Sequence, residues 1–174
     1  MSITGTSEKK TGRIRLGMVG GGQGAFIGAV HRLAARMDDH YEFVAGALSS
    51  NAARSKASGD ELGLAPDRIY GDFREMAKAE AKRKDGIEAV SIVTPNHMHF
   101  PAAKAFIEAG IHVICDKPLS LNLKEALALE KLLAKNKNVV FALTHNYSGY
   151  PMIRQARAMV AAGDLGDIRV VQGE

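Results

Sequence analysis

Tryptophan is absent from the 174-residue sequence, cysteine occurs once, and aromatic residues make up only 6%. A single cysteine cannot form an intramolecular disulfide, which excludes a disulfide-stabilised scaffold and is compatible with a reducing compartment. That residue, Cys115, lies in the apolar run HVICDKP. A free cysteine in such a run usually packs as a small hydrophobic side chain, so we expect Cys115 in the core.

Long hydrophobic runs are missing as well. No apolar stretch reaches the roughly 20 residues of a membrane-spanning helix. The first dozen residues, MSITGTSEKKTG, lack the apolar segment of a secretory signal. These absences predict a cytoplasmic protein that has no membrane partner.

Charge of one sign does not dominate. The sequence contains 23 Lys and Arg residues and 19 Asp and Glu residues, for a net charge of +4. Basic and acidic residues are mixed along predicted helices, as in REMAKAEAKRKDG. A nucleic-acid-binding surface would instead gather basic residues and interleave them with aromatics, so we expect no nucleic-acid partner. His97 and His99 lack a neighbouring acid or cysteine that would complete a ligand set, so no metal is expected.

Short β-branched apolar runs alternate with amphipathic helical patterns along the chain. One such run, IEAVSIVT, is almost continuously apolar, which is typical of a strand buried on both faces of a sheet. Regular alternation of this kind predicts an α/β fold with a doubly wound, mostly parallel sheet. Strands are predicted at residues 14–20, 41–48, 68–71, 87–94, 111–116 and 139–144, and helices at 25–37, 51–64, 73–84, 99–110 and 123–136.

We divide the chain into three parts. Residues 1–12 are predicted to be a disordered polar tail, and residues 13–147 a Rossmann-like dinucleotide-binding domain. Residues 148–174 contain an amphipathic helical pattern, a glycine turn and a β-branched run. They are predicted to be a linking helix and the first strand of a truncated α+β second domain.

The stretch GMVGGGQGAFIGAVHR, residues 17–32, joins the first predicted strand to the first predicted helix. It fits a dinucleotide-binding loop in two registers. Gly20, Gly22 and Ala25 match G-x-G-x-x-A, whereas Gly20, Gly22 and Gly28 match a loop with extra residues in its second interval. In either register the backbone can approach a pyrophosphate and the helix N-terminus can bind it. A ligand-free glycine turn and the glycine loop of S-adenosylmethionine enzymes are the alternatives.

The end of the second predicted strand bears on the choice of cofactor. NAD-preferring domains commonly carry Asp or Glu there, which binds the ribose hydroxyls. This sequence has Ser49, Ser50 and Asn51 instead, followed by Arg54. Hydroxyls and a guanidinium can bind a 2′-phosphate that a carboxylate would repel, so these residues favour NADP(H). The alternative is a capped helix start with an exposed arginine.

Two more stretches stand at the ends of predicted strands, where open α/β sheets bind ligands. The residues Thr94, Pro95 and Asn96 end one strand, and Asp116 and Lys117 end the next. Taken alone, each stretch is also compatible with an ordinary surface turn.

Together these motifs resemble the Gfo/Idh/MocA oxidoreductases, a family named for glucose–fructose oxidoreductase and inositol dehydrogenase. The resemblance rests on the stretches GGGQGAFIGAVH, VSIVTPNHMHFPAAKAFIEAGIHVICDKPLS and THNYSGYPMIRQARAMVAAGDLGDIRVV. It covers nearly everything from Ile14 onward. It implies a nucleotide-binding domain followed by an α+β domain that carries substrate residues and often the oligomer interface, so we expect a homo-oligomer in the complete protein.

The resemblance implies a role for each matching residue. Lys117 corresponds to the catalytic-site lysine, which contacts the reacting substrate hydroxyl, and Asp116 replaces the more usual glutamate. His145 and Asn146 would face the substrate, and the bond Lys117–Pro118 is often cis in the family. The implied cofactor-binding residues are Gly20, Gly22, Gln23, Gly24, Ala25, Phe26, Ile27, Ser49, Ser50, Asn51, Arg54, Thr94, Pro95, Asn96, His99, Asp116 and Lys117.

The activity that the resemblance implies is hydride transfer between nicotinamide and a hydroxyl- or carbonyl-bearing carbon of a sugar- or cyclitol-type substrate. The chain would be the nucleotide-binding half of such an NAD(P)-dependent enzyme, and alone it is expected to show little or no turnover. A non-catalytic NAD(P)-binding sensor or scaffold is the main alternative. An S-adenosylmethionine methyltransferase is a second one, which the strand ends TPN and DKP disfavour.

Overall fold

The computed structural model describes residues 12–172. The predicted polar tail therefore lies outside the described residues, apart from Gly12. The chain divides between Leu143 and Thr144 into two compact units, whereas the predicted nucleotide-binding domain extends to residue 147.

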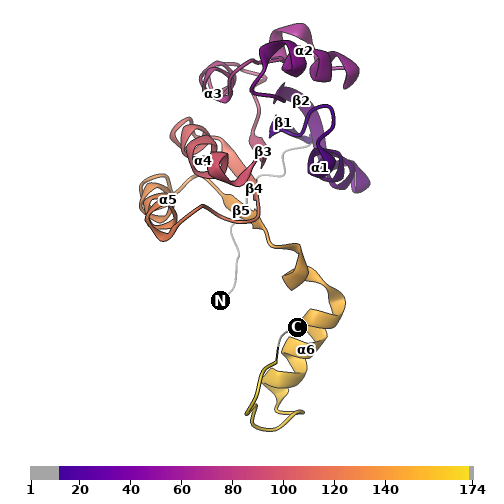
Figure 1. Ribbon diagram of the computed structural model, residues 1–174, viewed down its shortest axis with the longest axis vertical. Helices are drawn as coiled ribbons and strands as arrows, with labels where there is room; N and C mark the ends of the chain where they lie inside the picture. Colours follow the sequence, from indigo (N-terminus) through magenta and orange to yellow (C-terminus); the bar gives the residue numbers. More distant parts are fainter. Residues whose placement is uncertain (1–11, 173–174) are drawn as a thin grey trace. The chain divides into compact units, whose positions relative to one another are not determined.

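A five-stranded sheet with the order β2-β1-β3-β4-β5 forms the centre of the first unit. The pairs β1–β2, β1–β3 and β3–β4 are all parallel, which confirms the predicted doubly wound α/β fold. Helix α1 lies on the opposite side of the strands from α4 and α5 (Figure 1). The strands are β1 (Ile14–Gly20), β2 (Tyr41–Ala47), β3 (Ala89–Val93), β4 (His112–Asp116) and β5 (Phe141–Thr144), and the helices of this unit are α1 (Phe26–Met37), α2 (Ala52–Glu61), α3 (Phe73–Glu80), α4 (His99–Glu108) and α5 (Leu123–Lys135).

The direction of winding changes between β1 and β3. The chain moves from β1 to the neighbouring β2, returns across β1 to β3, and then continues outward through β4 and β5. In open α/β sheets, the crossovers on the two sides of such a point leave a crevice at the carboxyl ends of the strands. The topology therefore places the candidate site where β1 and β3 end, at Gly20 and Val93.

The core surrounds β3, all five residues of which are buried. Phe106 and Ile107 of α4 pack in the same cluster of buried side chains, as does Leu129 of α5. Cys115 belongs to this cluster as well and is fully buried, which confirms the expectation that it packs in the core. Burial raises the pKa of its thiol to about 12, so the group is inert at neutral pH.

The prediction of a strand at residues 68–71 is wrong. Residues 66–68 form a short 3-10 helix instead, and Ile69 contributes only an isolated parallel bridge to Gly46. The physical reason is length, because Asp72 already caps α3 through the N–H groups of Arg74 and Glu75. Too few residues separate the 3-10 helix from this cap for a ladder to form.

Several other elements differ from the prediction in their bounds; α3, for example, ends at Glu80 and not at residue 84. Helix α2 ends at Glu61 because Gly63 adopts φ +72° and the N–H of Leu64 bonds back to the carbonyl of Gly59, which closes the helix. The strand expected after α6 is not formed within residues 168–172. A strand needs a neighbour for its hydrogen bonds, and the described residues provide none there.

The second unit contains a short 3-10 helix, Asn146–Gly149, and helix α6, Pro151–Ala162. The rings of Tyr147 and Tyr150 pack edge to face, with centroids 5.7 Å apart. Pro151 stands in the first turn of α6, and Gly163 at φ +80° ends it, as expected for proline at a helix start and glycine after a helix end. A helix is thus present where the sequence predicted one, and its role as a link to a second domain stays a prediction. In the described part of the chain, no helix is long and apolar enough to cross a membrane.

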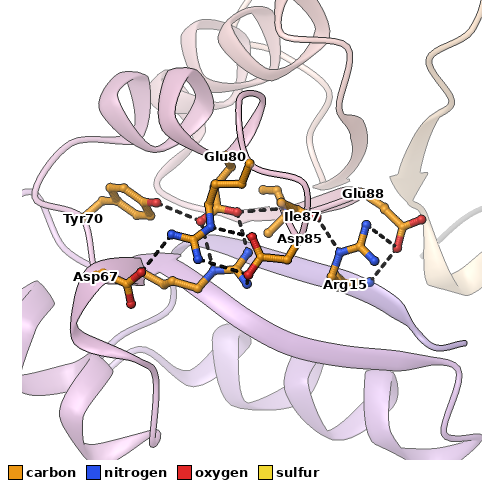
Figure 2. Close-up of polar contacts among 10 residues, drawn as sticks. Arg15, Asp67, Tyr70, Glu80, Asp85, Ile87 and Glu88 are labelled. Carbon is orange, nitrogen blue, oxygen red and sulfur yellow. Dashed lines mark hydrogen bonds and ion pairs between the residues drawn. The ribbon is translucent and has the colours of Figure 1, made fainter.

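A buried ion pair connects α3 to the segments before and after it. Glu80 is 1% exposed and Arg68 is 7% exposed. The carboxylate of Glu80 accepts hydrogen bonds from the Arg68 guanidinium, from the Tyr70 hydroxyl at 2.8 Å and from the N–H of Ile87 at 3.0 Å. Figure 2 shows these contacts and the neighbouring carboxylate of Asp85. All of them lie at the amino end of β3, away from the predicted site.

We expect Glu80→Ala to lower the free energy of unfolding by about 3–5 kcal/mol, because it leaves the Arg68 guanidinium buried without its main partner. Urea unfolding of the chain measures this loss. The matched control is Glu108→Ala, which removes an exposed ion pair with Lys104 and should cost no more than about 1 kcal/mol. Equal losses in the two variants would contradict this account of the buried pair.

Candidate nucleotide-binding site

The glycine loop follows β1 directly, and steric contacts explain its glycines. Gly20 and Gly21 both adopt positive φ, at 79° and 73°, a conformation that side chains disfavour. Gly22 donates its N–H to the carbonyl of Leu48, and a Cβ there would lie 2.6 Å from the Oγ of Ser58. The loop is thereby held against the end of β2 and the middle of α2, with its backbone exposed to the cleft.

A backbone contact between Gly21 and Gly28 decides which register applies. A Cβ added to Gly28 would lie 2.4 Å from the Cα of Gly21. Gly28 is therefore the glycine that lets helix and strand pack closely, which is the role of the third glycine in a dinucleotide-binding loop. The loop is lengthened between its second and third glycines, as one of the two predicted registers has it.

Helix α1 begins beside this loop without a side-chain cap. Its N-cap residue, Ala25, offers no acceptor, and the first turn contains no acid. Helices α2, α3 and α5 are capped by Asn51, Asp72 and Asn122. The first N–H groups of α1 are thus available to an external acceptor, and the helix dipole favours an anion there.

A cleft of about 510 Å³ lies at the carboxyl ends of β1, β2 and β3. It coincides with the point where the direction of winding changes. Nine residues that the sequence predicted as cofactor-binding line it: Gly20, Gly22, Gln23, Ala25, Ser49, Ser50, Arg54, Thr94 and Pro95. Their contact with a cofactor stays a prediction.

The other predicted cofactor residues lie elsewhere. Gly24 and Phe26 line an adjacent hollow of about 330 Å³, and Ile27 packs against a second core cluster formed by Met18, Leu48, Leu64 and Val93. Asn51 caps α2. Asn96, His99, Asp116 and Lys117 do not line the cleft.

Sequence reasoning missed several residues of the cleft wall. Ser58 of α2 accepts a hydrogen bond from the N–H of Gln23 at 3.0 Å and so supports the loop. Arg74 lies over the ring of Phe73, 4.4 Å from its centroid, and pairs with Asp72. Phosphate-binding motifs end before this segment, so only the tertiary structure could reveal it. The missed residues are Val19, Gly21, Ala47, Leu48, Ser58, Gly71, Asp72, Phe73, Arg74, Val93, His97 and Met98.

Thr94, at the end of β3, carries a buried hydroxyl oxygen with no hydrogen-bond partner among the described residues. A buried polar atom left unpaired costs free energy, so such atoms are rare and need an explanation. Because Thr94 lines the cleft, a polar ligand group would satisfy its hydroxyl. This atom, the glycine loop and the uncapped α1 all fit a dinucleotide.

Comparison with known proteins agrees with this geometry. Residues 14–156 match the model of the oxidoreductase family with an NAD-binding Rossmann fold, GFO_IDH_MocA. The chain belongs to the Gfo/Idh/MocA family. This confirms the resemblance seen in the sequence and identifies the cleft as part of an NAD-binding Rossmann domain.

Three relatives illustrate the relationship. An oxidoreductase from Sinorhizobium meliloti is 63% identical, with a TM-score of 0.84 over 90% of this chain and 43% of the other. An inositol dehydrogenase homolog from Azotobacter vinelandii, complexed with NADH and myo-inositol, is 46% identical, with a TM-score of 0.87 over 91% of this chain and 42% of the other. A levoglucosan dehydrogenase from Pseudarthrobacter phenanthrenivorans is 32% identical over 92% of this chain and 40% of its own length. The chain thus spans about two fifths of these Gfo/Idh/MocA relatives.

In this Gfo/Idh/MocA chain, Lys117 is exposed and follows β4, and its bond to Pro118 is cis, as the resemblance implied. His145 and Asn146 belong to the second unit, at its 3-10 helix. Their predicted place beside the substrate is untested.

Asp116, the neighbour of Lys117, faces a histidine from another element. His31 of α1 places Nδ1 2.8 Å from the Oγ of the buried Ser91, and its Nε2 lies 3.9 Å from Oδ1 of Asp116. Burial lowers the pKa of His31, and the negative charge of Asp116 partly offsets that shift. A neutral ring with its proton on Nε2 directs that N–H toward Asp116 and accepts from the Ser91 hydroxyl.

We expect Gly28→Ala to destabilise the first unit by about 1–3 kcal/mol, because α1 must move away from Gly21. The same movement should weaken NADH binding, since it displaces the N-terminus of α1. Urea unfolding and fluorescence titration measure the two effects. Gly149→Ala is the control because a Cβ there meets nothing within 4 Å. Wild-type stability in Gly28→Ala would refute the close-packing role.

The pKa of His31 should fall further in Asp116→Asn, because the variant removes a charge that stabilises the imidazolium. Since the pKa is already below 6.5 in the folded chain, the unfolded chain binds this proton more readily. Stability therefore decreases as the pH falls below about 6.5. NMR titration of the ring checks the shift, with Asp164→Asn as a control of equal charge change. An unchanged pKa in Asp116→Asn would show that the two groups are not coupled.

Proposed function

We propose that the chain is the cofactor-binding part of a longer NAD(P)-dependent oxidoreductase that acts on CH–OH groups of sugar- or cyclitol-type substrates. The observation that carries the proposal is the single cleft that combines the glycine loop, the uncapped N-terminus of α1 and the unpaired Thr94 hydroxyl. The names of relatives support the substrate class, since one is a levoglucosan dehydrogenase and another is complexed with myo-inositol.

Different residues bind the cofactor and the substrate. The backbone of Gly20 and Gly22 and the first N–H groups of α1 bind the pyrophosphate, and the Thr94 hydroxyl binds a polar group nearer the nicotinamide. A nicotinamide held there would supply the hydride chemistry. Lys117 hydrogen-bonds the reacting hydroxyl and takes part in moving its proton, while His145 and Asn146 bind the substrate.

The cleft wall favours NADP(H) over NAD(H). Ser49 stands where NAD-preferring domains carry an acid, and its Oγ accepts a hydrogen bond from the N–H of Asn51 at 3.2 Å. Arg54 and Arg74 bring two guanidiniums to the same wall. The carboxylate there, Asp72, caps α3 and pairs with Arg74, so it does not take the place of a ribose-binding acid. A 2′-phosphate finds cationic donors in this wall.

Location and assembly rest on the sequence alone. A cytoplasmic location and a homo-oligomer in the complete protein stay predictions. The non-catalytic sensor or scaffold predicts no turnover in the full-length protein, which the lysine experiment below distinguishes.

We expect the chain to bind NADPH more tightly than NADH in a fluorescence titration. Ser49→Asp should reduce NADPH affinity about 10-fold or more, because a carboxylate repels the 2′-phosphate, and should leave NADH binding unchanged or stronger. Asn138→Asp adds the same charge on an exposed residue outside the cleft and is the control. Equal or tighter binding of NADH to the wild-type chain would contradict the NADP preference.

In the full-length protein, Lys117→Ala should lower kcat by a factor on the order of 100 or more, as loss of an acid–base group does. The dissociation constant of the cofactor should change far less, because Lys117 does not line the cleft. Steady-state kinetics with a cyclitol or sugar substrate and a separate cofactor titration measure the two. An unchanged kcat would rule out Lys117 as the catalytic lysine.

A further inference from the structure

The imidazole of His99, the first residue of α4, lies between two strand ends. Its side chain is only 1% exposed. Nδ1 lies 2.6 Å from the carbonyl oxygen of Pro118, and Nε2 lies 3.0 Å from the carbonyl oxygen of Thr94. One ring therefore spans from the end of β3, which lines the cleft, to the turn that carries Lys117, which does not.

No pairing between β3 and β4 connects the two turns at this position. The parallel register between β3 and β4 ends with the pair Ile92 and Cys115. Beyond that pair the two strand ends continue as separate turns, one through Thr94 and the other through Lys117. The two contacts of His99 thus connect the turns where strand pairing has stopped.

Both partners of the ring are backbone carbonyl oxygens, which only accept hydrogen bonds. A hydrogen bond to either oxygen therefore has a ring N–H of His99 as its donor, and the tautomer decides which nitrogen donates. Because each ring nitrogen lies within hydrogen-bond distance of a different turn, the imidazole fixes the spacing between the two turns.

We propose that His99 is a positioning residue: its buried imidazole, packed between the carbonyl oxygens of Pro118 and Thr94, holds the Lys117 turn against the Thr94 turn. The consequence for catalysis rests on the proposed function, in which Lys117 is the catalytic lysine. A displacement of about 1 Å between reacting groups can lower turnover on the order of 100-fold. His99 would thus act on the reaction through Lys117 without touching the cofactor cleft.

The hydrogen bonding of the ring is tested first, in the 174-residue chain. In chain labelled with ¹⁵N-histidine, NMR detects a ring N–H whose proton exchanges slowly with water because it is buried and hydrogen-bonded. We expect such an N–H for His99, and its signal is assigned by its loss in His99→Gln. Rapid exchange at both ring nitrogens would overturn the proposal.

The position of Lys117 is tested next. Lysines are ¹³C-dimethylated, and the Lys117 signal is assigned by its loss in Lys117→Arg. We expect His99→Gln to shift this signal, and His40→Gln, which removes an exposed histidine of the same unit, to leave it in place. An unmoved signal in folded His99→Gln would overturn the positioning role.

Circular dichroism shows whether His99→Gln folds. If it does not, the ring nitrogens of the wild-type chain decide the proposal by themselves, with assignment by elimination from single variants of the other histidines. Neither measurement depends on cofactor binding or turnover, so failure of this proposal and failure of the proposed function are distinguishable.

Discussion

The contact between Gly21 and Gly28 is the constraint on which the site depends. Because neither residue has a Cβ, α1 can begin directly against the end of β1. That placement directs the uncapped N-terminus of α1 toward the cleft and leaves the loop backbone accessible. Any side chain at these positions would separate helix from strand, and the proposed pyrophosphate site would lose its geometry.

Buried polar groups at the two ends of the sheet differ in whether they have hydrogen-bond partners. At the amino end of β3, Glu80 is fully engaged by Arg68, Tyr70 and the Ile87 backbone (Figure 2), and this network serves stability. At the carboxyl end, the Thr94 hydroxyl has no partner among the described residues and α1 has no cap. Unsatisfied groups are costly, so a fold retains them where a ligand or the chemistry needs them. The polar groups thus separate the stabilising end of this domain from its binding end.

Pattern reasoning succeeded where a local rule applied and failed where packing decided. The glycine loop and the Thr94 turn were found in the sequence because backbone geometry demands glycine and proline at such turns. The side chain of Asn51, which the sequence assigned to the cofactor, caps α2, because the same residue type serves both roles. The side chain of Ile27, which was assigned likewise, packs against the second core cluster. A contact of either backbone with the cofactor stays a prediction. Arg74 was overlooked because no motif marks a residue that reaches the cleft from α3.

The sequence alone determined the alternation of strands and helices and the parallel sheet, because hydrophobic periodicity is a local property of the chain. Its motifs also resemble those of the family to which the chain belongs. It also has a serine and not a carboxylate at Ser49, and the predicted preference for NADP(H) rests on this residue. Only the tertiary structure decided the register of the glycine loop, the loss of the third predicted strand, and the pairing of His31 with Ser91 and of His99 with two carbonyls. These features depend on distances between residues far apart in the chain, which close packing sets and local pattern does not record.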